Sequence, residues 1–184
     1  MQFNYSEKTL PLSTAMNNFD PKTHHRRSVR WKEHDYSSEG IYFITICCIN
    51  MKFCFGHINE GVMKFNSLGI YAATCWKKIP LFYLGVRLHE FVIMPNHIHG
   101  IIELVKSLDR TISHDPPDPR AQICAPTIGR IVRGFKAAVS KYAGYTVWQR
   151  NYYEHVIRSD NELRFIAHYI EYNPLQWDKD KYKK

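Results

Sequence analysis

The chain has 184 residues, 45% of them hydrophobic and 14% aromatic, which excludes a wholly disordered protein and is sufficient for one domain with a real core. The sequence contains no signal peptide and no apolar run of about eighteen residues, so we expect a cytoplasmic protein without a membrane partner. The five cysteines include no Cys-x-x-Cys pair, which argues against a zinc or disulfide framework. The formal net charge of +8 and the many aromatic rings favour a nucleic-acid partner.

Residues 1–39 are predicted to form a basic, partly flexible N-terminal arm. The run from His24 to Lys32 contains four Arg or Lys residues and a tryptophan. Such an arm can grip phosphates, and a solvated tail is the alternative. Arg26, Arg27 and Arg30 are the candidate contacts in this arm.

The next segments predict a strand, a connection and a helix. Residues 41–49 are apolar on both faces and rich in β-formers, which is typical of a central strand covered on both sides. Residues 50–61 are predicted to form a connection or a short hairpin. From about residue 66 to 79 the apolar residues follow helical spacing, and Pro80 is expected to end this helix.

Two apolar runs, at residues 86–94 and 97–104, predict a pair of strands. They are rich in Val and Ile, and Pro95-Asn96 between them is a turn sequence. Residues 105–126 are predicted to form a mobile insertion loop, because their clustered prolines are incompatible with a regular element.

The last third of the domain predicts a helix, a strand and a final helix. Thr127 is a plausible N-cap of a helix that Gly144 ends. Residues 147–157 are predicted to form a strand. Ser159, with a glutamate three residues later, forms a capping-box sequence before a helix over residues 160–172.

The resulting order, β-α-β-β-α-β-α, predicts the fold class. We expect an α+β domain over residues 40–177, with a ferredoxin-like or RRM-like antiparallel sheet and an added C-terminal helix, followed by a short tail at 178–184. The outer face of the helix after Thr127 carries four charged residues that are all cationic, which modestly favours phosphate contact. Its cations are Arg130, Arg133, Lys136 and Lys141.

The strand at residues 97–104 places two imidazoles side by side. Side chains alternate between the faces of a strand, so His97 and His99 share one face, while Ile98 and Ile102 on the other face can pack in a core. Two imidazoles two residues apart can reach one metal ion. A pair of ordinary strand histidines is the alternative, because the pattern is short and common.

The final helix carries two polar side chains on a flank of its apolar stripe, Tyr169 and Asn173, one turn apart. Tyr169 is a possible nucleophile, with a half-buried core aromatic as the alternative. Asn173 offers an amide oxygen that, with two imidazoles, leaves positions open on a hard divalent ion for a phosphate. Alternatively, Asn173 is only the C-cap that ends the helix before Pro174. Spacing does not choose among the other candidate nucleophiles, which are Tyr152, Tyr153 and Tyr172.

Three segments together resemble the single-tyrosine HUH transposases, most closely the REP-associated tyrosine transposases. They are Met94-Pro95-Asn96-His97-Ile98-His99, Trp148 to Arg158, and His168-Tyr169-Ile170-Glu171-Tyr172-Asn173-Pro174. The similarity covers roughly residues 22–177, and the segments occur in the order that the family has. The long Pro-rich insertion after Val105 and the short sequence after Trp177 depart from the family pattern.

The resemblance implies an enzyme that nicks and rejoins single-stranded DNA at hairpins, in DNA transposition or in the processing of repeats. It places the nucleophile at Tyr169 and the metal ligands at His97, His99 and Asn173, with Mg²⁺ or Mn²⁺ as cofactor. The tyrosine oxygen would form a 5′-phosphotyrosine and free a 3′-hydroxyl. We expect a monomer or homodimer. The predicted DNA contacts are Arg26, Arg27, Arg30, Arg133, Lys136 and Arg150.

Two other classes of protein remain as alternatives. The first is a module that binds structured single strands without cutting them, although such a binder would need neither the histidine pair nor Tyr169. The second is a structural metal protein. Two histidines and one asparagine make a poor closed zinc site, which usually has four strong ligands.

Overall fold

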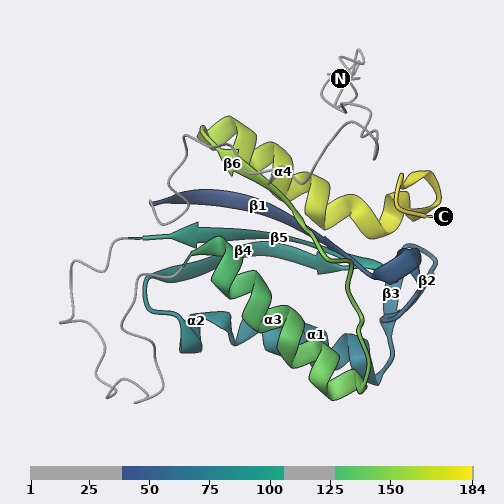
Figure 1. Cartoon of the computed structure of the whole chain (residues 1–184). Coiled ribbons are helices and arrows are strands. Elements are labelled where there is room, and N and C mark those ends of the chain that lie inside the picture. The colour runs from purple at the N-terminus through teal and green to yellow at the C-terminus, as the bar shows by residue number, and fades with distance from the viewer. Residues whose placement is uncertain (1–38, 106–126, 184) are drawn as a thin grey trace, which may run out of the picture. The chain divides into compact units, whose positions relative to one another are not determined.

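A computed structural model of the chain describes residues 39–105 and 127–183 (Figure 1). The predicted contacts Arg26, Arg27 and Arg30, and residues 106–126 of the predicted insertion, lie outside these ranges. The described elements are β1 (Gly40–Cys47), the 3-10 turn η1 (Ile49–Met51), β2 (Gly56–Asn59), β3 (Val62–Phe65), α1 (Ser67–Lys77), α2 (Ile79–Phe82), β4 (Val86–Ile93), β5 (His97–Leu104), α3 (Ile128–Ala143), β6 (Tyr153–Ile157), α4 (Asp160–Tyr172) and the 3-10 segment η2 (Asn173–Lys179).

The main sheet has the strand order β4-β5-β1-β6, and all its neighbouring strands are antiparallel. This topology confirms the predicted α+β, ferredoxin-like fold with an added C-terminal helix. The two central strands pair along their whole length, from Gly40 opposite Leu104 to Cys47 opposite His97. The small β2-β3 hairpin turns at Glu60 and Gly61, whose φ angles of 50° and 73° suit a tight hairpin turn.

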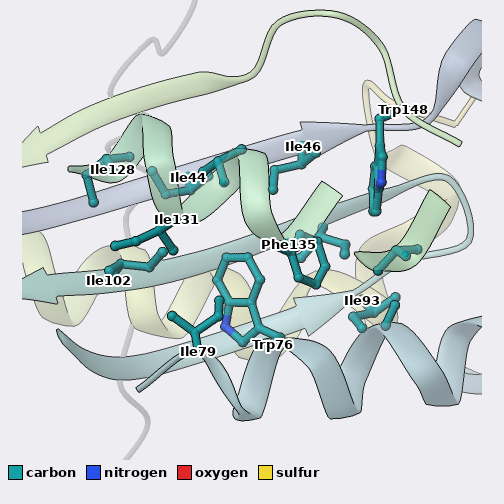
Figure 2. Close-up of a cluster of buried hydrophobic side chains, with 14 of the residues drawn as sticks. Ile44, Ile46, Trp76, Ile79, Ile93, Ile102, Ile128, Ile131, Phe135 and Trp148 are labelled. Atoms are coloured by element: carbon teal, nitrogen blue, oxygen red, sulfur yellow. The ribbon is translucent and has the colours of Figure 1, made fainter. Parts of the chain in front are cut away.

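Helices cover both faces of the sheet, α1 and α3 on one and α4 on the other (Figure 1). The larger core lies on the α1–α3 side, where Ile44, Trp76 and Phe135 pack together (Figure 2). A smaller core joins Ile101 of β5 to Ile170 of α4. Strand β1 is thus central and covered on both sides, as predicted. None of the helices in the described ranges combines the length and the apolar character that crossing a bilayer would require.

The predicted caps form, and they explain where the helices begin and end. The Thr127 hydroxyl accepts the N–H of Arg130, and the Ser159 hydroxyl accepts the N–H of Glu162. Gly144 ends α3 with a φ of 77°, a conformation that glycine adopts without strain.

Three element boundaries differ from the prediction. Strand β1 ends at Cys47, and Ile49 begins the 3-10 turn η1. Helix α1 ends at Lys77, and Pro80 lies in the first turn of the separate short helix α2, where a missing N–H costs nothing. Strand β6 begins only at Tyr153, although Trp148 forms an isolated antiparallel bridge with Cys48. Between this bridge and β6, the carbonyl oxygens of Gln149 and Asn151 accept hydrogen bonds from the Lys136 ammonium group.

Candidate active site

The two imidazoles predicted to act together meet on the α4 side of β5. Both His97 and His99 are buried, and their Nε2 atoms lie 3.1 Å apart. Side chains alternate along a strand, so His97, His99 and Ile101 share one face of β5. Ile101 packs against α4, which shows that this face is the one that α4 covers. The structure therefore brings together the two nitrogen atoms that a metal ion would need.

Asn96, fully buried beside the pair, fixes the ring of His97. Its amide nitrogen lies 2.7 Å from the carbonyl oxygen of Tyr182 and 3.3 Å from that of Met51, and carbonyl oxygens can only accept. The amide oxygen of Asn96 therefore faces His97 and accepts its Nδ1–H at 2.8 Å. Consequently, the Nε2 atom of neutral His97 carries a free electron pair.

His99 is held by the neighbouring strand β1. Its Nδ1 lies 2.8 Å from the Thr45 hydroxyl, directly across the ladder, and its ring stacks on Phe43 at a centroid distance of 5.3 Å. A hydroxyl both donates and accepts. Thr45 can therefore accept the Nδ1–H of His99, and in that tautomer the Nε2 atom of His99 carries an electron pair.

Tyr169 reaches the imidazole pair from α4. Its hydroxyl oxygen lies 3.3 Å from the Nε2 atom of His99, although the two residues are 70 positions apart in sequence. Its ring also meets Phe43 edge-on. The other candidate tyrosines have different surroundings: Tyr152 faces the Lys136 ammonium group, Tyr153 is half exposed, and Tyr172 packs on His168.

The residues after α4 fold back onto the same site. Asn173 is buried, and its Oδ1 atom has no hydrogen-bond partner. The rings of Trp177 and Tyr182 pack on His97 at centroid distances of 6.2 and 4.6 Å. Asp180 lies between Trp177 and Tyr182 in the sequence, and its side chain is buried, with only 4% exposed. Sequence reasoning placed residues 178–184 in a tail and did not assign them to the site.

The donor set fits a divalent cation. The two imidazole nitrogens lie 3.1 Å apart, and the Asn173 side chain, which contacts the Tyr169 hydroxyl beside them, has an unpaired buried amide oxygen. Nitrogen and oxygen donors together suit an ion such as Mn²⁺. Within the described ranges, no group of three or more His, Cys, Asp or Glu side chains is already placed to hold a metal ion. The imidazole pair therefore needs additional donors, and Asn173 is the one that the sequence predicts.

Burial determines the protonation of the site. It lowers the pKa of His97 to about 3, with a smaller effect from the charge of Lys181, and it holds the pKa of His99 well below its usual value. Burial also raises the pKa of Tyr169 to about 12, helped by the negative charge of Asp180 and partly offset by a hydrogen bond with Asn173. At neutral pH the imidazoles are thus neutral and the phenol keeps its proton.

The metal-free protein should lose stability below neutral pH. The unfolded state takes up a proton on His97 below its ordinary pKa of 6.5, but the folded state does so only near pH 3. The free energy of unfolding therefore falls with pH through this window, by about 2 kcal/mol between pH 7.5 and 5 for His97 alone. Urea unfolding at both pH values in EDTA measures the effect.

One variant isolates the contribution of His97. His97→Gln should remove about that 2 kcal/mol from the pH dependence. An equal pH dependence in wild type and His97→Gln would contradict a neutral buried imidazole.

The predicted cationic contacts within the described ranges lie in different environments. Arg133 and Arg150 are exposed. Arg133 belongs to α3, which covers the face of the sheet opposite α4 (Figure 1). Lys136 donates to the carbonyl oxygens of Gln149 and Asn151 at 2.8 and 2.9 Å, and burial lowers its pKa to about 8. Lys136 therefore holds the segment before β6, and its contact with DNA stays a prediction.

Sequence reasoning did not identify Thr45, Asn96, Asp180 and Tyr182 as parts of the site. Asn96 adjoins His97 in the turn sequence, which is the only sequence signal that could have indicated it. Thr45 is found only once the register of β1 and β5 is known, and the contact of Tyr182 with Asn96 spans 86 positions.

Comparisons with known proteins bear on the family and the fold of the chain. No protein-family model matches the chain. An uncharacterised protein of Haemophilus influenzae (strain ATCC 51907 / DSM 11121 / KW20 / Rd) is 47% identical over 167 residues, which cover 86% of this chain and 93% of that protein. A putative REP-associated tyrosine transposase of the same strain is 27% identical over 145 residues, 77% of this chain and 74% of that protein.

A solved structure of a REP-associated tyrosine transposase bound to a REP hairpin has the same fold. It matches with a TM-score of 0.54 and 18% identity, over 86% of this chain and 76% of that chain. This match shows that the two chains share a fold. The chain belongs to the same family as the uncharacterised H. influenzae protein, and its resemblance to the REP-associated tyrosine transposases is confirmed.

Proposed function

We propose that this protein is a metal-dependent nuclease and strand transferase that binds single-stranded DNA hairpins and cuts them with Tyr169. The observation that carries the proposal is the Tyr169 hydroxyl 3.3 Å from Nε2 of His99, whose own neighbour is Nε2 of His97 at 3.1 Å. The transposase relative and the solved hairpin complex support hairpin DNA as the partner. Transposition or the processing of repeats is the biological setting that this chemistry serves.

The reaction is a phosphoryl transfer to the phenol. The Tyr169 oxygen bonds to the scissile phosphorus, the bond from phosphorus to the 3′ oxygen breaks, and the proton lost by the phenol is balanced by one gained by the leaving 3′ oxygen. The products are a 5′-phosphotyrosine and a free 3′-hydroxyl. Attack by a second 3′-hydroxyl reverses the step and joins two strands.

The chain's own residues supply most of what this step needs. His97, His99 and Asn173 would hold a divalent cation, which supplies positive charge against the developing charge on the phosphate. The high pKa of Tyr169 means that a free phenolate is scarce at neutral pH, so charge neutralisation at the phosphate is essential. Phe43 packs against both Tyr169 and His99 and orients them.

Labelled hairpin oligonucleotides test the proposal. Hairpins taken from inverted repeats that flank the host gene are incubated with the protein and Mn²⁺ or EDTA. With Mn²⁺, a 3′ label should move to the protein on a denaturing gel, and a 5′ label should appear on a shorter strand that a polymerase extends. EDTA should abolish both products, and peptide mass analysis should place the adduct on Tyr169.

The alternative outcomes separate the competing functions. Tight hairpin binding with no cleavage in Mn²⁺ or Mg²⁺ would contradict the nuclease and favour the non-cleaving binding module. A 5′ label retained on the protein would show the opposite polarity of attack and would exclude the proposed 5′-phosphotyrosine.

A further inference from the structure

We propose that the carboxylate of Asp180 is a direct ligand of the divalent cation held by His97 and His99. This inference rests on the proposed metal-dependent function and adds a donor to the set formed by the two imidazoles and Asn173. The Asp180 side chain is 96% buried, since only 4% of it is exposed, and its Oδ2 atom lies 3.8 Å from Nε2 of His97.

The two carboxylate oxygens of Asp180 have unequal surroundings. Oδ1 accepts the backbone N–H of Tyr182 at 2.7 Å, which fixes the orientation of the side chain. Oδ2 is buried and no group among the described residues forms a hydrogen bond of good geometry with it. Burial raises the pKa of this carboxyl, and the nearby Asn173 side chain and the charge of Lys181 only partly oppose that rise. An unpaired buried carboxylate oxygen is costly, so its position calls for a cation or a donor.

His97 cannot satisfy Oδ2 in its neutral form. Because Asn96 accepts the Nδ1–H of His97, the Nε2 atom of the neutral ring carries an electron pair rather than a hydrogen. Oδ2 and Nε2 are therefore two acceptors that face each other at 3.8 Å. Two metal bonds of about 2.1 Å together span up to about 4.2 Å, so one ion can contact both atoms.

The charge of the site favours the same assignment. Two neutral imidazoles and an amide offer a dication no negative charge, whereas a carboxylate strengthens binding of hard divalent ions. The unpaired Oδ1 atom of Asn173 is a second buried oxygen in this region without a partner. Both unpaired oxygens are accounted for if a cation binds there.

The surrounding contacts hold Asp180 at the site. Trp177 packs between Phe53 and His97, with ring distances of 5.7 and 6.2 Å. On the other side, the Tyr182 carbonyl accepts a hydrogen bond from Asn96. The residues on either side of Asp180 are thus fixed to the start of β5, and its carboxylate is placed before an ion binds.

Mn²⁺ binding to the full-length protein tests the assignment without reference to cleavage. Calorimetry and the electron paramagnetic resonance of free Mn²⁺ give the affinity. Asp180→Asn, which keeps the shape and removes the charge, should weaken Mn²⁺ binding about tenfold or more. Asp180→Glu, which keeps a carboxylate, should bind more tightly than Asp180→Asn. Thermal melts in EDTA show whether each variant is folded.

Asp178→Asn is the matched control. Asp178 lies two positions away in the same segment, but its side chain is 90% exposed and pairs with Lys183. This variant should bind Mn²⁺ as the wild type does. Mn²⁺ should also raise the melting temperature of wild type and Asp178→Asn more than that of Asp180→Asn, because only ions that bind the folded state stabilise it.

His97→Gln separates failure of this inference from failure of the proposed function. If His97→Gln loses Mn²⁺ but Asp180→Asn binds it within twofold of wild type, Asp180 is not a ligand and the histidine site stands. If the wild type itself does not bind Mn²⁺, the metal-dependent function fails together with this inference.

Discussion

Replacing Tyr169 with phenylalanine should abolish DNA cleavage and the covalent protein–DNA adduct, with a loss in rate of about a thousandfold or more. The substitution deletes the one oxygen that lies 3.3 Å from Nε2 of His99, and a benzene ring offers no atom that can attack phosphorus. The measurement is transfer of a 3′ label from a hairpin to the protein in Mn²⁺, under single-turnover conditions.

The fold and the metal site should survive this change. The ring keeps its edge contact with Phe43. Loss of one hydroxyl hydrogen bond costs about 1 kcal/mol of stability. Hairpin binding and Mn²⁺ affinity should therefore remain close to wild type, which separates a missing nucleophile from a misfolded site.

Tyr172→Phe is the control on the same helix. Tyr172 lies three positions further along α4, is 40% exposed and packs on His168. Its loss should leave adduct formation within a few-fold of wild type. An adduct that persists in Tyr169→Phe and disappears in Tyr172→Phe would identify Tyr172 as the nucleophile and would overturn the assignment of Tyr169.

Local sequence patterns predicted the fold because its elements depend on local chemistry. The period of two in β5, the caps at Thr127 and Ser159, and the left-handed Gly144 are properties of short segments, and all of them appear in the structure. The break between the Trp148 bridge and β6 could not be predicted in this way, because a lysine from α3 binds the carbonyl oxygens there.

The candidate site was partly predictable for the same reason. Alternation along one strand places His97 and His99 together, and helical spacing places Tyr169 on a flank of the apolar stripe. The choice of Tyr169 among the tyrosines came from the family resemblance. The residues that position these groups come from tertiary structure: Thr45 lies opposite His99 through strand register, and Asp180 arrives through the folding back of η2. No local spacing relates them to the histidine pair.

Gly100→Ala should destabilise the protein by about 3 kcal/mol or more, because β5 lies against the core with no room for a methyl group. A Cβ atom at Gly100 would lie 2.3 Å from Cζ2 of Trp76 and 3.0 Å from Cε2. The indole cannot move aside easily, since it is fully buried and packs against Phe91 and Phe135. Urea unfolding in EDTA gives the change in free energy.

A double-mutant cycle with Trp76→Leu shows whether the contact between the new methyl group and the Trp76 indole causes the loss of stability. Trp76→Leu alone leaves a cavity and should cost about 3 kcal/mol. It also removes the indole atoms that a methyl group at position 100 would meet. Adding Gly100→Ala to Trp76→Leu should then cost much less than adding it to wild type, with a coupling energy of about 2 kcal/mol. Strict additivity would contradict the proposed clash.

The same cycle connects the core to the metal site. Gly100 follows His99 directly, so a methyl group that pushes β5 away from α1 should also displace the imidazoles from Thr45 and Tyr169. Gly100→Ala should therefore weaken Mn²⁺ binding, and Trp76→Leu should restore it in the double variant. Recovery of stability without recovery of Mn²⁺ affinity would show that the depth of β5 in the core does not control the geometry of the histidine pair.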